Sequence, residues 1–236
     1  MNLPSKSDKG VSQGDSKGSE TLASAVYDRL LEDILNGNLE PGLKLRLQVL
    51  KKNYEVGNSP LREALNRLSE NGLVVREENK GFKVAPASEE ELKELIRTRC
   101  WLEEIALRES IRNGDESWEE QVVLAFHRLS RISSPGGSKE HYNTREWEQR
   151  HREYHVALMS ACDSSFLLGY CAQLHENTLR YRNLAEVMEY RERHELEEHK
   201  AIQAAALNRD AELAVSLMKA HFEVTAEIVL SSGSIS

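Results

Sequence analysis

The chain has 236 residues, of which 39% are hydrophobic and 30% are charged, and this length suits one large or two modest domains. No run approaches the roughly 18 apolar residues that a bilayer-spanning helix needs. The N-terminus has no apolar signal core, so the sequence predicts no export. The three cysteines form no C-x-x-C pair and indicate buried thiols in a reduced cytoplasm.

The formal net charge of −8 argues against a nucleic-acid binder until it is divided along the chain. Residues 21–86 contain ten Lys and Arg against nine Asp and Glu, whereas residues 87–236 contain 18 against 27. Only a local basic surface matters for DNA binding, so the acidity of the C-terminal part does not exclude it. We therefore expect two domains with different partners. Residues 1–20, rich in Ser, Gly and Lys, are expected to form a disordered tail.

The first predicted helix follows this tail, in "TLASAVYDRLLEDILNG". One of its faces carries four apolar residues at helical spacing, Leu22, Val26, Leu30 and Ile34. Gly37 follows where a helix end favours glycine. The segment "LEPGLKL" then predicts a turn, and "LQVLKKNYEV" predicts a short second helix whose Leu50 and Tyr54 face inward.

The third predicted helix lies in "SPLREALNRL". Ser59 is expected to cap it and Pro60 to occupy its first position, where the missing N–H has no partner to lose. Its leucines turn one face inward, which leaves Arg62 on the opposite, hydrogen-bonding face. Two β-rich runs follow as a hairpin, Leu73–Arg76 and Phe82–Ala85. Three helices followed by a hairpin predict a winged helix-turn-helix over residues 21–86.

In a winged helix-turn-helix the third helix lies in the DNA major groove, where an arginine can donate two hydrogen bonds to guanine. Arg62 is the candidate for that contact. The other residues expected to contact DNA lie beside it or on neighbouring elements: Asn58, Ser59, Asn66, Gln48, Lys51 and Lys80. The alternative is a winged helix that binds a protein through a solvated charged face.

The segments "GNLEPG", "SPLREAL", "ENGLV" and "KGFKV" occur in an order and spacing that resembles the N-terminal domain of the GntR family of bacterial transcription regulators. The resemblance covers residues 26–86 and implies the family's mode of DNA binding, with Arg62 retained. Many members carry arginines where this chain has Asn58 and Gln48. The resemblance therefore does not imply an operator sequence.

Residues 87–232 contain no strand-like runs and predict about six helices packed as a bundle with its own core. The sequences that begin at Ser88 and Ser117, "SEEE" and "SWEE", have the form of capping boxes. Asp163 and Asp210 are expected to cap later helices. The segment "SSPGGSKEHYN" predicts a loop between the second and third helices of this part.

Four of the eight histidines lie on faces that a bundle turns inward. His151 and His155 are one helical turn apart, and His199 and His221 lie on apolar stripes of two later helices. Imidazoles from facing helices can complete a tetrahedral metal site. The alternative is a set of core histidines that bond to their neighbours. The other four show no such convergence: His127, His141, His175 and His194.

Arg99 shares a helical stripe with three leucines and an alanine, so it is expected to point into the bundle. A buried guanidinium requires an anion, either a protein carboxylate or a bound ligand. Arg182, on the inner side of its own helix, can bind an anion in the same way. A structural ion pair is the more common explanation for either arginine alone.

The stretches "RTRCWLEEIA", "HREYHVAL" and "EHKAIQAA" resemble the FCD ligand-binding domain of the FadR subgroup in the same family. The resemblance implies an all-helical bundle that holds zinc or nickel through an aspartate and three histidines, beside an arginine that binds a small carboxylate effector. His155, His199 and His221 match the histidines and Arg99 matches the arginine, whereas His151 stands where aspartate is usual. The likeness to glutarate-responsive members implies a dicarboxylate or an amino-acid breakdown product as effector.

The sequence thus predicts a mainly α protein with a winged helix-turn-helix over residues 21–86 and an FCD-type effector-binding and dimerisation bundle over residues 87–232. The expected function is a cytoplasmic, DNA-binding repressor, a homodimer on operator DNA that a small carboxylic acid releases. Two alternatives are an enzyme with a catalytic metal centre and a protein-interaction module. Against the enzyme hypothesis, the sequence contains no nucleophile motif, and Glu148 lies off the stripe of histidines where a general base would be needed.

Overall fold

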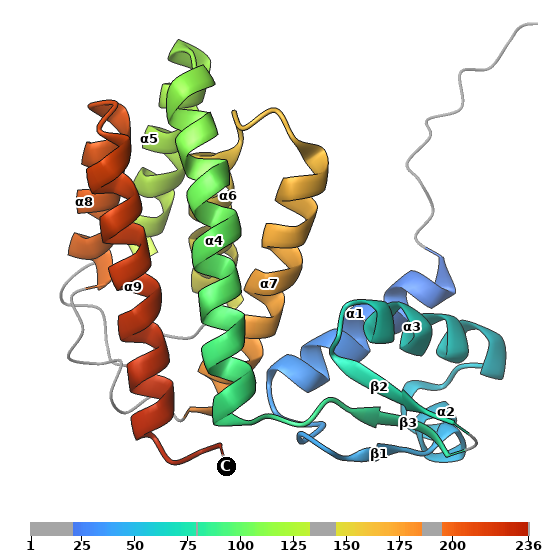
Figure 1. Cartoon of the computed structure of the whole chain (residues 1–236). Coiled ribbons are helices and arrows are strands. Elements are labelled where there is room, and N and C mark those ends of the chain that lie inside the picture. The colour runs from blue at the N-terminus through green and yellow to red at the C-terminus, as the bar shows by residue number, and fades with distance from the viewer. Residues whose placement is uncertain (1–20, 79, 133–144, 186–194, 236) are drawn as a thin grey trace, which may run out of the picture.

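The structure, a computed structural model, describes residues 21–78, 80–132, 145–185 and 195–235. These residues form a small N-terminal domain beside a larger helical bundle (Figure 1). The expected tail, the predicted loop "SSPGGSKEHYN" and two of the histidines, His141 and His194, lie outside the described residues. Within those four ranges, no helix is both long enough and apolar enough to cross a membrane.

The N-terminal domain is a winged helix-turn-helix, as the sequence predicts. Its helices are α1 (Leu22–Leu35), α2 (Leu47–Tyr54) and α3 (Asn58–Glu70). Its strands are β1 (Lys44–Leu45), β2 (Val74–Glu77) and β3 (Gly81–Val84). The sheet is antiparallel in the order β1-β3-β2, and its inward side chains join those of the helices in one apolar core.

The start of α3 differs from the prediction. The helix begins at Asn58 and the preceding Gly57 makes no side-chain cap, so Ser59 is not the cap and Pro60 occupies the third helical position. Proline is tolerated there because the N–H groups of the first turn have no partner within the helix. The segment predicted only as a turn contains β1, which pairs with β3. A strand of two residues has no periodicity that a sequence pattern can show.

The C-terminal domain is a bundle of long helices around a second apolar core, again as predicted. Its helices are α4 (Glu89–Asn113), α5 (Glu116–Ile132), α6 (Arg145–Met159), α7 (Ser165–Leu184), α8 (Glu195–Leu207) and α9 (Ala211–Ser231).

The expected helix caps of the bundle are correct in two of four cases. Ser88 caps α4, and Asp210 caps α9. At the start of α5, however, Asp115 rather than Ser117 accepts the backbone N–H of Trp118. Ser164 rather than Asp163 caps α7.

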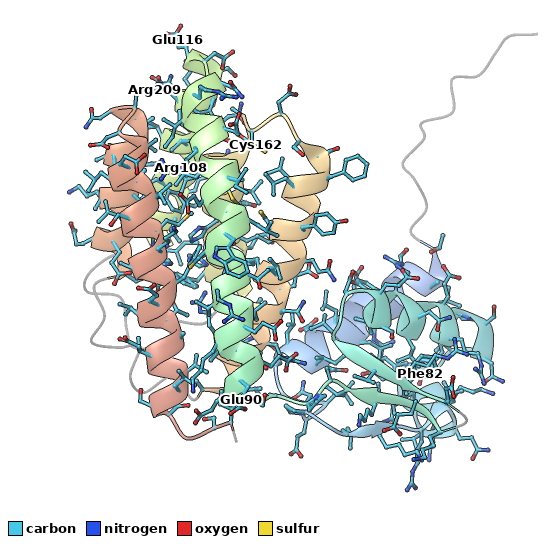
Figure 2. The ribbon with its side chains drawn as sticks, viewed as in Figure 1. Phe82, Glu90, Arg108, Glu116, Cys162 and Arg209 are labelled. Carbon is cyan, nitrogen blue, oxygen red and sulfur yellow. The ribbon has the colours of Figure 1, made fainter. Side chains whose placement is uncertain are left out.

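Ion pairs and a hydrogen bond join the helices at the end of the bundle far from the N-terminal domain, where Figure 2 labels Arg108, Glu116 and Arg209. Arg209 donates to the carbonyl oxygen of Ile111, at 2.7 Å, and pairs with Glu119. Arg108 pairs with Glu212 on α9. These contacts fix the ends of α4, α5 and α9 relative to one another.

Helix α7 also makes hydrogen bonds to the N-terminal domain. The side-chain amide of Gln173 donates to the carbonyl oxygen of Glu70, at 3.2 Å, and that of Asn177 donates to the carbonyl oxygen of Asn71, at 3.0 Å. Arg180, which is 1% exposed, donates to the carbonyl oxygens of the connection between β3 and α4. One helix of the bundle therefore holds both the end of α3 and the interdomain connection.

Candidate functional site

The residues expected to contact DNA all lie exposed on the N-terminal domain. Asn58, Ser59, Arg62 and Asn66 belong to α3, Gln48 and Lys51 to α2, and Lys80 to the turn between β2 and β3. Among the described residues, none forms a hydrogen bond or ion pair with Arg62. Its guanidinium is thus available to a ligand.

Other cations of the same domain are held by internal partners. Arg67, one turn further along α3, donates to the hydroxyl of Ser24 at 3.3 Å and lies over the ring of Tyr27, 4.2 Å from its centroid. Lys83 pairs with Glu77 at 3.0 Å. The helix therefore carries one arginine that stabilises the fold and one that faces solvent.

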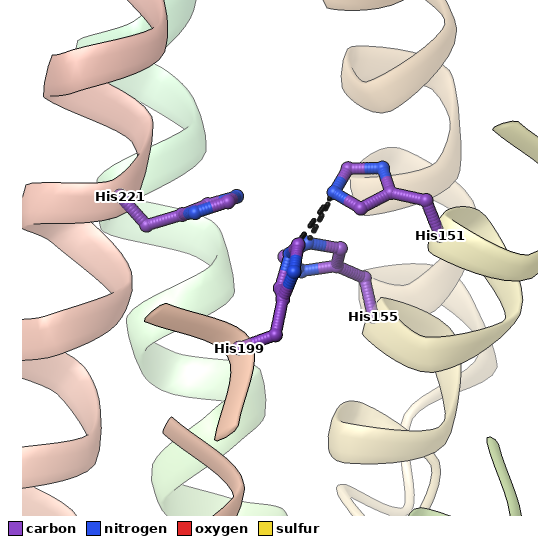
Figure 3. Close-up of side chains that lie close together, drawn as sticks. All are labelled: His151, His155, His199 and His221. Carbon is purple, nitrogen blue, oxygen red and sulfur yellow. Dashed lines mark hydrogen bonds between the residues drawn. The ribbon is translucent and has the colours of Figure 1, made fainter. Parts of the chain in front are cut away.

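The four inward histidines meet inside the bundle (Figure 3). His151 and His155 come from α6, His199 from α8 and His221 from α9, and each is at most 4% exposed. One nitrogen of each ring lies within 4.8 Å of the others. The Nε2 atom of His151 is 3.1 Å from the Nε2 atoms of both His155 and His199.

These nitrogen atoms could hold a transition-metal ion. A tetrahedral ion with bonds of about 2.0–2.1 Å to nitrogen holds its ligand atoms roughly 3.4 Å apart, and the two separations from His151, both 3.1 Å, are close to this distance. Glu198 accepts a hydrogen bond from Nδ1 of His221, at 2.8 Å. A carboxylate in that position fixes the proton on Nδ1 and makes Nε2 the nitrogen whose lone pair can bind a metal. Imidazole ligands suit zinc and nickel alike.

His151 differs from His221 in the hydrogen bond that its Nδ1 atom makes. Its Nδ1 atom lies 3.3 Å from Nη1 of Arg182. Because a guanidinium can only donate, Nδ1 accepts, and the neutral ring carries its proton on Nε2, the atom that faces the other histidines. Metal binding by His151 requires the loss of that proton or a turn of the ring, so this histidine is the least prepared ligand of the four.

Burial keeps the imidazoles uncharged. It lowers the pKa of His151 and of His155 well below 6.5, and the charges of neighbouring histidines and arginines lower both further. Uncharged imidazole is the form that binds a metal. His151 and His155 are therefore uncharged at neutral pH, although His151 still carries the Nε2 proton that metal binding must remove.

Arg99 points into the bundle, as expected, and has a protein partner. It is 4% exposed, its Nε donates to Oε1 of Glu103 at 2.7 Å, and its guanidinium carbon lies 4.1 Å from the centroid of the Phe222 ring. The second oxygen of Glu103, Oε2, has no hydrogen-bond partner among the described residues. Burial raises the pKa of Glu103, and the charge and hydrogen bond of Arg99 oppose that rise.

Arg182 lies between the carboxylates of Glu148, which is half-buried, and Glu195, which is buried. Its Nη2 atom is 3.4 Å from Oε1 of Glu148 and 3.9 Å from Oε1 of Glu195. Burial and the neighbouring Glu195 raise the pKa of Glu148, while Arg182 lowers it. Both arginines thus have the ion pair that the sequence left open as an alternative.

The two arginines and two of the clustered histidines share one interior cavity. Arg99, Arg182, His151 and His221 line it together with His175, and its volume is about 10 Å³. A space of this size holds about one water molecule. A larger ligand therefore enters only if packed side chains or helices move.

The four histidines expected to converge are the ones that meet, and His175 lies beside them without belonging to the set. Its ring centroid lies 5.8 Å from that of His151 and 6.2 Å from that of His155, and the residue is 8% exposed. The signal was present in the sequence, since His175 shares the inner stripe of α7 with Thr178 and Arg182. The exposed His127 does stand apart, as expected.

Comparisons with known proteins assign this architecture to a family. The model of the "Bacterial regulatory proteins, gntR family" matches residues 22–84, and the model of the FCD domain matches residues 94–224. The HTH-type transcriptional regulator BphR of Paraburkholderia xenovorans LB400 is 38% identical over 213 residues, which are 90% of this chain and 87% of BphR. The HTH-type transcriptional repressor GlaR of Escherichia coli K12 is 33% identical over 201 residues, 83% of this chain and 90% of GlaR.

A solved structure shares the whole fold. The E. coli protein McbR/YncC superposes with a TM-score of 0.70 at 21% identity, over 89% of this chain and 98% of that one. Both domains of the chain thus match regulators over nearly their full length. The chain belongs to the GntR family of bacterial regulators and is a DNA-binding transcription regulator with an FCD domain, not an enzyme.

Proposed function

We propose that the protein is a repressor whose FCD bundle holds a zinc or nickel ion and a small carboxylic acid, and that the acid releases operator DNA. One observation carries the proposal: two buried arginines and three buried histidines, two of them from the cluster of four, line a single cavity. Guanidinium groups bind carboxylates, and uncharged imidazoles bind these metals. The name of the relative GlaR, a repressor, supports the direction of regulation.

In this proposal His155, His199 and His221 hold the metal, and His151 supplies the fourth nitrogen when it gives up its Nε2 proton. The ion would add positive charge to the interior, which favours a bound carboxylate.

The acid is proposed to bind Arg99 and Arg182, and the dicarboxylates and amino-acid breakdown products are the candidate class. Because the cavity between these arginines is about 10 Å³, the acid must shift the packing around it. A ligand that binds one arrangement of the helices better than another changes DNA affinity by that difference. Helix α7 carries Arg182 and also contacts the N-terminal domain, which supports a link between the two.

On the DNA side, Arg62 is proposed to read a guanine, with Asn58, Ser59 and Asn66 beside it and Gln48, Lys51 and Lys80 on the flanking backbone. We further propose a homodimer, because operators of this motif are commonly paired half-sites, and a cytoplasmic location, where the operator is.

The test is a fluorescence-anisotropy titration of the full-length, zinc-loaded protein on labelled DNA from upstream of its own gene. Small mono- and dicarboxylic acids are added in turn, and an acid that acts as effector should weaken binding roughly 5- to 150-fold. Arg99→Met and Arg182→Met should abolish the release. Arg108→Met, which removes an arginine at the far end of α4, should retain it. An acid that stabilises the protein and leaves its DNA affinity unchanged would contradict the proposed control.

A further inference from the structure

We infer that the body of the effector lies in a larger cleft between α6 and α7, and that the effector carries a hydroxyl or amino group near its carboxylate, which Glu103 and His175 bind. This inference rests on the proposed function, since it assumes that a carboxylic acid is the effector. It adds the place of the ligand's body and a chemical feature that selects among acids.

The cleft opens between α6 and α7, and α4 closes its inner end. Its volume is about 300 Å³, the lower limit of typical small-molecule pockets. Val156, Met159 and Leu168 give it an apolar lining. His155, Glu103 and His175 lie on its lining as well, so the cleft reaches the histidine cluster. His175 lines both this cleft and the small cavity at Arg99, which places the two spaces side by side.

Two residues on the lining of this cleft each have a buried polar atom without a hydrogen-bond partner. Neither Oε2 of Glu103 nor Nε2 of His175 has a hydrogen bond to any described residue, and the residues are 1% and 8% exposed. Buried polar atoms in folded proteins are nearly always paired, so an unpaired couple on one cleft indicates a ligand. A hydroxyl group satisfies both atoms, because it donates to the carboxylate and accepts from the imidazole. An amino group donates to both.

The Arg99–Glu103 pair fixes where this group sits on the ligand. Arg99 bonds to one oxygen of the Glu103 carboxylate, and the unpaired oxygen belongs to the same carboxylate. A ligand carboxylate at Arg99 is therefore close to a donor at Glu103. The chemistry fits an acid substituted next to its carboxylate, with its aliphatic remainder between α6 and α7.

The glycine at position 169 is a further observation in favour of an open ligand cleft. It lies inside α7 and lines the cleft, and a Cβ atom added there meets no heavy atom within 4 Å. Its φ is not in the left-handed region, so neither backbone strain nor close packing requires glycine. Glycine inside a helix is unfavourable relative to alanine. Its effect at this position is to leave room at the mouth.

Occupancy of this cleft acts directly on α7, the helix that carries Gln173, Asn177 and Arg180 to the N-terminal domain. The body of an effector held between α6 and α7 changes the distance between these two helices. The hydrogen bonds to the end of α3 then move with α7.

The experiment measures binding by isothermal titration and DNA release by anisotropy, with the full-length, zinc-loaded protein. The probes are pentanoate, hexanoate and pentanedioate, each compared with its 2-hydroxy and 2-amino derivative. At least one derivative is expected to bind about tenfold more tightly than its parent acid, or better. Glu103→Gln, which replaces the accepting oxygen by a donating amide, should remove that preference.

Two leucine substitutions test the place of the ligand. Gly169→Leu fills the mouth of the cleft and should weaken binding at least about tenfold, with Ala172→Leu as a second filling variant if the first fails to fold. Tyr170→Leu adds a leucine at an exposed neighbouring position of α7 and is the matched control. Equal binding by Gly169→Leu and Tyr170→Leu would place the acid elsewhere and leave the proposed function standing. Equal binding of parent acids and derivatives to the wild-type protein would overturn the chemical assignment. If no acid binds the wild-type protein, both proposals fail.

Discussion

Replacing Arg180 with methionine is expected to loosen the N-terminal domain from the bundle without unfolding either one. Arg180 is 1% exposed, and its guanidinium donates to the carbonyl oxygens of Ala85 and Pro86, at 3.2 and 3.3 Å. Both carbonyl groups belong to the connection between β3 and α4. Methionine fills most of the same space with an apolar chain, so the substitution mainly removes hydrogen bonds.

The size of the effect follows from these contacts. A hydrogen bond with a charged donor contributes about 1.5–3 kcal/mol, and the lower value applies to bonds at the long end of the distance range. Two such bonds give about 3 kcal/mol. The ion pair with Glu91, at 3.4 Å and with the carboxylate side chain 45% exposed, adds less than about 1 kcal/mol. Methionine avoids the cost of burying a charge, so about 3 kcal/mol is an upper value.

Differential scanning calorimetry of the full-length protein measures this change. We expect Arg180→Met to separate the unfolding of the N-terminal domain from that of the bundle, with the first transition lowered by as much as roughly 20 °C. Arg112→Met, which removes an exposed arginine of α4, is the control. A transition at the wild-type temperature in Arg180→Met would refute the reasoning, because it would mean that these hydrogen bonds do not couple the domains.

Four further outcomes are expected. Arg62→Ala should weaken specific operator binding by about 1–3 kcal/mol at an unchanged melting temperature, and a gel-shift titration checks this. His155→Ala should lose the zinc detected by elemental analysis after reconstitution, whereas the exposed His127→Ala should keep it. His151→Asp should bind zinc more tightly in a competition titration, because a carboxylate adds a negative charge and has no Nε2 proton to lose. In the metal-free protein, burial lowers the pKa of His151, His155 and His175, so below about pH 6.5 the unfolded chain binds more protons than the folded one. The free energy of unfolding should then fall as the pH decreases, by up to about 1.4 kcal/mol per pH unit for each of these histidines. Urea unfolding at pH 7.5 and 5.5 measures this fall, and His175→Gln should make it smaller.

Helical periodicity was sufficient to predict the architecture and most of the inward histidines. His151, His155 and His199 each lie on a stripe whose apolar members are mostly buried, so the facing side could be predicted from the sequence. The inward face of the last helix was harder to predict, because α9 has apolar residues on most of its circumference. Leu213 was placed on the inner stripe and is 48% exposed, whereas Met218 and Phe222 are buried.

The partners of the buried arginines depend on how the helices pack. Glu103 lies one helical turn after Arg99, and this spacing is visible in the sequence. Glu148 and Glu195 come from different helices and meet Arg182 only in the folded bundle. No pattern within one helix reports such a contact. The same holds for Arg180, whose partners are backbone carbonyl groups of the other domain.

The connection between the two domains limits the spacing of the operator. Strand β3 ends at Val84 and α4 begins at Glu89, so only residues 85–88 join them. Even fully extended, such a segment reaches about 13 Å, and Arg180 holds its first two carbonyl groups. The N-terminal domain can pivot about this point and cannot travel far from it. In the proposed homodimer, the two bundles therefore set the separation of the recognition helices. An insertion of about five base pairs, half a helical turn, would carry one half-site to the opposite face of the duplex, beyond the reach of so short a tether.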